Sequence, residues 1–73
     1  MTKFQSYLND VCLYYRTYSS LGMRLGQSYM NCLPTNLREL LKNDENHDCF
    51  YEDGKIANLL TYLSTLPELS WRY

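Results

Sequence analysis

The chain has 73 residues, eight of them tyrosines, and its formal net charge at neutral pH is −1. A chain of this length makes one domain with a small core, so self-association, a metal or a partner often adds to its stability. The weak net charge excludes a strongly basic nucleic-acid-binding protein and an acidic mimic of DNA. A hydrophobic content of 45%, with only three glycines and two prolines, argues against disorder.

The charges are unevenly distributed along the chain. Residues 1–42 hold five basic and two acidic side chains, a net charge of +3, whereas residues 43–73 hold two basic and six acidic side chains, a net charge of −4. The simpler interpretation is that the two segments pack together and complement each other. The alternative is a bipolar surface that meets a partner.

The cysteines and the hydropathy pattern bear on where the protein works. Cys12, Cys32 and Cys49 are odd in number and widely spaced, which favours reduced thiols over a disulfide framework. The first residues lead into an amphipathic pattern rather than the apolar core of a secretory signal. No apolar run approaches the roughly 20 residues that span a membrane. We therefore expect a cytoplasmic protein that does not enter the membrane.

A helix is predicted over residues 3–18. Thr2 and Gln5 have the spacing of a capping box at its start. Apolar and tyrosine side chains recur at the helical period and share one broad face. This stripe consists of Phe4, Tyr7, Leu8, Val11, Tyr14, Tyr15 and Tyr18. Their rings suit either a small core or a binding surface.

A second helix is predicted over residues 21–33, where Pro34 stops it. Gly22 and Gly26 lie four residues apart within this pattern. Each glycine costs a helix roughly 1 kcal/mol relative to alanine. Their presence predicts that another helix approaches closely along that side.

A short helix is predicted over residues 36–42, where Asn36 and Glu39 have the spacing of a second capping box. Residues 43–52, which we call the acidic loop, follow it. The apolar residues 49–51 interrupt the loop and predict that it is held against the core.

The last predicted helix covers residues 54–66, with Asp53 as its cap and Pro67 after its end. No segment alternates as a β-strand does, so no sheet is expected. The prediction for residues 1–73 is a single all-α domain, a bundle of three main helices and one short helix.

The sequence contains only partial matches to metal and catalytic sites. The acidic loop opens like a calcium-binding EF-hand, but Cys49 stands where glycine is needed and Lys55 where the bidentate glutamate belongs. Zinc would need Cys12, Cys32, His47 and Cys49, and this set lacks the usual closely spaced pairs. A cysteine–histidine catalytic pair would lack an orienting group and an oxyanion hole. We therefore expect no metal, no cofactor and no enzymatic activity.

Two groups of residues are candidates for contact with a partner. The first lies on the second predicted helix, where Arg24, Gln27 and Asn31 fall on one strip beside Met30. The second is the sequence 71–73, because Trp, Arg and Tyr dominate binding hot spots. The alternatives are a solvated polar face for the strip and a C-terminal segment tied onto the core. A third location for an interface is the acidic loop.

Residues 21–64 resemble a pattern found in small hypothetical proteins of phages and bacterial genomes. The pattern reads R-x-G-Q-x-x-x-N-x-L, then D-x-F-Y-x-D-x-K-I. Its matched positions are Arg24, Gly26, Gln27, Asn31, Leu33, Asp48, Phe50, Tyr51, Asp53, Lys55 and Ile56. The resemblance implies a short cytoplasmic protein of a phage or mobile element, and such proteins often disable a host protein by binding it. It implies no catalytic or ligand-binding role for any residue.

The leading functional hypothesis is therefore a protein-interaction module, an inhibitor or modulator of a host protein, such as a defence factor. The alternative is a nucleic-acid-binding regulator that uses the basic residues of the first half, Arg16, Arg24, Arg38 and Lys42. Apolar side chains remain outside one small core, among them Leu13 and Met23. A homodimer would bury them, so we also expect self-association.

Overall fold

The fold was analysed in a computed structural model, which describes residues 2–71. Across these residues the chain forms four α-helices and three short 3₁₀ turns, and no strand. The all-α prediction is confirmed. In chain order the elements are α1 (Lys3–Tyr18), η1 (Ser19–Leu21), α2 (Leu25–Asn31), α3 (Thr35–Leu41), η2 (Asp53–Lys55), α4 (Ile56–Ser64) and η3 (Glu68–Ser70).

Helix α1 has the predicted bounds and the predicted cap. The Gln5 amide donates to the Thr2 hydroxyl at 3.1 Å, and the Thr2 amide donates to the Gln5 side-chain oxygen at 2.9 Å. These two bonds satisfy amide groups that the first helical turn leaves without a partner.

Helix α2 is much shorter than the predicted helix 21–33. Gly22 ends the preceding 3₁₀ turn with φ at +92°, a left-handed conformation that glycine adopts without strain. Helical geometry therefore resumes only at Leu25. At the other end, Pro34 disfavours helical geometry in the residue before it, and α2 ends at Asn31.

Gly26 does allow a close approach, but the approaching segment is the acidic loop and not a helix. A side-chain carbon at Gly26 would overlap the backbone oxygen of Cys49 and lie 2.7 Å from a carboxylate oxygen of Asp53. The two glycines therefore have different roles. Gly22 forms a turn, and Gly26 leaves room for the acidic loop.

The predicted caps of the last two helices are wrong. Helix α3 begins after Pro34, and the side chain of Asn36 donates to the Ser70 carbonyl at 2.8 Å. Asp53 lies in η2 and accepts from the Gly26 amide at 3.0 Å, so it caps α2 from across the molecule. Asp and Asn are good caps, but tertiary contacts decide which amide they reach.

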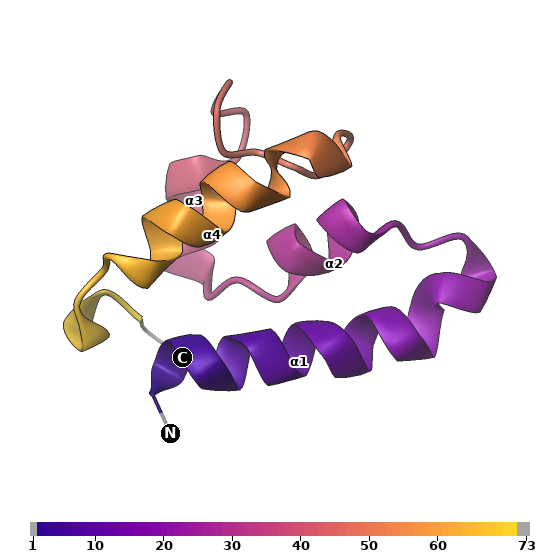
Figure 1. Ribbon diagram of the computed structural model, residues 1–73, viewed down its shortest axis with the longest axis horizontal. Helices are drawn as coiled ribbons and strands as arrows, with labels where there is room; N and C mark the ends of the chain where they lie inside the picture. The colour runs from indigo at the N-terminus through magenta and orange to yellow at the C-terminus, as the bar shows by residue number, and fades with distance from the viewer. Residues whose placement is uncertain (1, 72–73) are drawn as a thin grey trace.

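The core gathers side chains from all four helices, the acidic loop and the segment after η3. Helix α2 lies between α1 and the other two helices, and the described ends of the chain lie near each other (Figure 1). The buried hydrophobic residues are Tyr7, Val11, Met30, Leu33, Leu37, Leu41, Cys49, Leu59, Leu63 and Trp71.

The apolar stripe of α1 is only half buried. Tyr7 and Val11 belong to the core, and Phe4 packs against it. Tyr15 and Tyr18 are exposed, and Tyr14 is partly buried. The helical period placed these rings correctly on one face, but the rest of the chain covers only the N-terminal part of that face.

The ion pairs of residues 2–71 do not balance the charge difference between the two halves of the chain. The three pairs join Lys42 to Glu39, His47 to Asp44 and Lys55 to Glu52, so each pair links residues three apart. None of these pairs joins the basic residues of segment 1–42 to the acidic residues of segment 43–73. Within the same residues, no helix combines the length and the apolar character needed to cross a bilayer.

Candidate functional site

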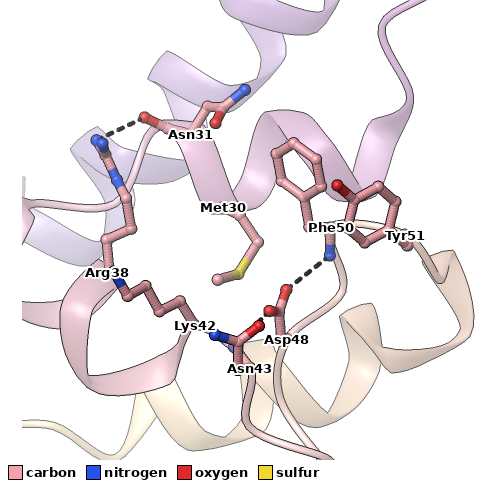
Figure 2. A pocket seen from close by; sticks show the side chains of 8 residues that line it. All are labelled: Met30, Asn31, Arg38, Lys42, Asn43, Asp48, Phe50 and Tyr51. Atoms are coloured by element: carbon pink, nitrogen blue, oxygen red, sulfur yellow. Dashed lines mark hydrogen bonds between the residues drawn. The ribbon is translucent and has the colours of Figure 1, made fainter.

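A pocket of about 210 Å³ opens between α2, α3 and the acidic loop, and we call it the α3 pocket. Its volume exceeds that of a cavity of about 150 Å³ that holds benzene. Figure 2 shows the side chain of Met30 between two walls, with Arg38 and Lys42 on one side and Phe50 and Tyr51 on the other. The complete lining is Met30, Asn31, Arg38, Lys42, Asn43, Asp48, Phe50 and Tyr51.

The cationic wall is held by the junction of α2 and α3. Arg38 donates from Nη2 to the backbone oxygens of Asn31, at 3.1 Å, and Leu33, at 3.2 Å. The Asn31 carbonyl belongs to the last residue of α2, where the helix dipole favours a positive charge, and Leu33 lies just after the helix. The guanidinium is therefore oriented before any ligand arrives. Lys42 follows one turn later and pairs at the surface with Glu39, at 3.1 Å.

The loop wall is organised by Asp48. One carboxylate oxygen accepts from the Asn43 amide at 2.6 Å, and the other accepts from the Phe50 amide at 3.0 Å. Asn43 has a positive φ of 65°, which asparagine tolerates better than most residues. Asp48 thus closes the turn and directs Phe50 and Tyr51, whose rings meet edge to face at 4.8 Å.

Cys49 anchors the loop beneath the pocket. Its side chain is fully buried, and its thiol donates to the Gly26 carbonyl at 3.4 Å. Burial raises the pKa of this thiol to about 11, so it stays protonated at neutral pH. Together with the bond from Gly26 to Asp53, this contact fastens the acidic loop to α2 on both sides of one glycine.

The predicted strip on α2 does not form one free recognition surface. Arg24 is exposed but precedes the helix, and its amide donates to the Gln27 side chain at 3.3 Å. The Asn31 side chain donates to the Tyr14 hydroxyl at 3.3 Å. Met30 is only 3% exposed. Met30 lines the α3 pocket, where a partner could reach it.

Trp71 is a core residue, so the interpretation of residue 71 as an exposed hot spot is wrong. Its side chain is 1% exposed, and its ring centroid lies 5.3 Å from that of Tyr7. The Trp71 carbonyl accepts from Nζ of Lys3 at 3.0 Å, and the Glu68 carboxylate accepts from the Lys3 amide. Arg72 and Tyr73 lie outside the described residues.

A second, larger hollow of about 410 Å³ lies along the C-terminal half of α1. We call it the α1 groove; it is lined by Val11, Cys12, Tyr15, Arg16, Ser19, Leu25 and Tyr29. Of the four basic residues in the nucleic-acid hypothesis, Arg16 lines this groove, whereas Arg38 and Lys42 line the α3 pocket. These three cations are therefore divided between two hollows.

The remaining candidates for chemistry are dispersed. Burial, reinforced by the charge of Asp10, raises the pKa of Cys32 to about 11, and Cys12 is exposed. His47 contacts Asp44 through Nδ1 at 2.9 Å, and bonds from Asn46 and His47 lower the pKa of the Asp44 carboxyl. In the described part of the chain, no three Cys, His, Asp or Glu side chains gather as a metal site would require.

Tyr51, a strongly exposed lining residue of the α3 pocket, is absent from the contact residues that the sequence predicted. The signal was present, because an apolar tripeptide in an otherwise polar loop must be anchored to something. Sequence alone did not reveal that Cys49 supplies the anchor while Tyr51 stays 79% exposed.

No family model, curated protein or solved structure matches this chain. The function has to be argued from the site itself. The two halves of the pattern that begins at Arg24 and ends at Ile56 lie together in the structure. They contact each other through the bond from Gly26 to Asp53, and both contribute residues to the α3 pocket.

Proposed function

We propose that this chain is a protein-interaction module and that the α3 pocket is its docking site. The observation that carries the proposal is Tyr51, a large ring 79% exposed at the mouth of a pocket floored by Met30. Aromatic, methionine and arginine side chains are the types enriched at protein interfaces. Together they would bury apolar surface against a partner.

The rigidity of the pocket supports the same proposal. The bonds of Asp48 hold one wall and the two carbonyl contacts of Arg38 hold the other. Because these groups are already ordered, a partner would lose less conformational entropy on binding.

Binding rather than catalysis is inferred from the lining of the pocket. Both oxygens of Asp48 are occupied by backbone amides, and no cysteine, serine or histidine is among the eight lining residues. The resemblance of residues 21–64 to small phage and bacterial proteins extends the proposal. The partner would be a bacterial host protein, met in the host cytoplasm, whose activity the chain inhibits or modulates.

The proposal is tested by affinity capture from a bacterial lysate, comparing the wild-type chain with two variants. Tyr51→Ser changes the pocket, and Leu69→Ser is the matched control because Leu69 is 89% exposed in η3. We expect Tyr51→Ser to retain its circular dichroism spectrum and to lose the specifically captured protein by about tenfold or more, as hot-spot truncations do. Leu69→Ser should capture normally. Equal capture by all three proteins would contradict the proposal.

The salt dependence of capture separates this function from the nucleic-acid alternative. Phosphate contacts weaken steeply as salt is raised from about 50 to about 200 mM, because counterions are released on binding. An interface centred on Tyr51 and Met30 should change little over that range. A nuclease-sensitive complex that disappears at the higher salt would favour the alternative.

A further inference from the structure

We infer that the α3 pocket receives one apolar side chain of a peptide segment bearing a carboxylate and a cation, with the carboxylate facing α3 and the cation facing the acidic loop. This inference rests on the proposed docking function and specifies the chemistry of the partner. It follows from the size of the pocket and from the opposite charges of its two borders.

The floor of the pocket selects an apolar group. Met30 and the partly buried Phe50 provide adaptable and aromatic surface, and Tyr51 extends that surface toward solvent. A volume of about 210 Å³ accommodates one aromatic or large aliphatic side chain. A methionine floor can adjust to either shape.

The α3 border selects a carboxylate. Arg38 presents an oriented guanidinium, and both of its hydrogen bonds to backbone oxygens use the same nitrogen, Nη2. A guanidinium carries five donors, so others can serve a ligand. Lys42 lies one turn away, and its pairing with the exposed Glu39 is of a kind that contributes little stability. It can exchange that partner for a carboxylate of the ligand.

The loop border carries the opposite charge. Residues 43–53 contain five Asp or Glu side chains and no Lys or Arg. Three of these acids, Asp44, Asp48 and Asp53, accept hydrogen bonds from backbone amides. Glu45 and Glu52 are exposed, and Glu52 pairs with Lys55 at 3.4 Å. Because Asp48 itself lines the pocket, a cationic side chain of a ligand would be attracted to this border.

This arrangement favours a peptide over a nucleic acid. A nucleic acid brings a phosphate at every nucleotide, so a strand held by Arg38 and Lys42 would carry further charges past the acidic loop. A peptide can place one carboxylate on one border and one cation on the other. Complementary charges of this kind also steer a partner into register.

The inference is tested with short blocked peptides of equal length in a glycine–serine background. The two mixed peptides carry Glu-Trp-Lys or Lys-Trp-Glu, which covers both chain directions. The three controls carry Glu-Ala-Lys, Lys-Trp-Lys and Glu-Trp-Glu, and a single-stranded oligonucleotide is the fourth control. Binding is followed by chemical shifts of the Met30 methyl group and the Tyr51 ring.

We expect one mixed peptide to bind at least about tenfold more tightly than the Glu-Ala-Lys control, because that control lacks the tryptophan side chain that would fill the pocket. Both single-sign peptides should bind more weakly than the mixed peptide. Lys42→Glu should lower the affinity for the mixed peptide by about threefold to tenfold, because the new carboxylate repels the carboxylate of the peptide. Arg16→Glu makes the same charge change in the α1 groove and should leave peptide affinity unchanged.

Several results would overturn the inference. If a single-sign peptide binds as tightly as the mixed peptide, the two borders of the pocket do not select opposite charges. If the oligonucleotide binds and changes the chemical shifts of Met30 and Tyr51, the occupant is a nucleic acid. Light scattering that shows a dimer of the wild-type chain but not of Tyr51→Ser would make a second copy the occupant. If the peptides fail while lysate capture still depends on Tyr51, the stated ligand chemistry is wrong and the docking function stands. If capture is also independent of Tyr51, both proposals fail.

Discussion

The two ends of α1 carry the same kinds of side chain, but these side chains are more deeply buried at the N-terminal end than at the C-terminal end. Near the N-terminus, Tyr7 is fully buried, and its hydroxyl donates to the Tyr29 carbonyl at 2.7 Å. Near the C-terminus, Tyr14 and Tyr18 pack their rings together at 4.7 Å, but Tyr18 stays exposed. The difference comes from Trp71, which covers only the first end. A tyrosine on an apolar stripe is a core residue only where a distant segment arrives to cover it.

The strongest test of this contrast is Trp71→Ala. Truncation of a fully buried tryptophan should lower the free energy of unfolding by about 3–5 kcal/mol, because it removes apolar contacts and leaves a cavity beside Tyr7. Urea titration followed by circular dichroism measures the change. Trp71→Phe, which retains a ring, should cost much less. A midpoint for Trp71→Ala close to that of the wild type would show that the segment after η3 does not hold the N-terminal end of α1.

A smaller effect is expected from Tyr7→Phe. The change keeps the ring in place and removes the hydroxyl that donates to Tyr29, so a partly buried carbonyl loses its donor. The cost should be about 1–2 kcal/mol in the free energy of unfolding. Chemical denaturation of the variant measures it. A loss as large as that of Trp71→Ala would mean that the substitution disturbs ring packing as well as the hydrogen bond.

The smallest effect is expected at the other end of the helix, from Tyr18→Ser. The Tyr18 ring is exposed, and its removal loses only the contact with Tyr14, so the free energy of unfolding should fall by no more than about 1 kcal/mol. Capture of the partner should also be unchanged, because Tyr18 does not line the α3 pocket. A stable variant that no longer captures its partner would move the docking site to the α1 end of the molecule.

These contrasts explain how far sequence reasoning reached. Local rules worked where the deciding contacts were local, as in the capping box of Thr2 and Gln5 and the extent of α1. They failed where a distant group decided the outcome. Asp53 was assigned to the following helix, yet its carboxylate reaches the amide of Gly26, 27 residues earlier in the chain.

The candidate site follows the same logic. The sequence predicted contact residues on α2 and at positions 71–73, but in the structure Trp71 and Met30 are both buried. The acidic loop, named only as a third location, supplies Tyr51 and Asp48 to the pocket. Helical periodicity describes one element at a time, whereas this pocket forms where two helices and a loop meet. Its existence depends on tertiary contacts such as that between Cys49 and Gly26.

The contacts that join Lys3 to Glu68 and Trp71 also determine when the molecule can fold during its synthesis. A ribosome produces α1 first, and the ring that covers Tyr7 is added nearly the whole chain later. Until then α2 covers part of the apolar face of α1, through contacts such as that between Tyr7 and Tyr29, but the side of Tyr7 that meets Trp71 is open. The contact between Lys3 and Trp71 joins positions 68 residues apart, and closing a loop of that length carries an entropic cost that slows folding. The N-terminal end of α1 therefore reaches its native packing only after the segment that carries Trp71 has been synthesised.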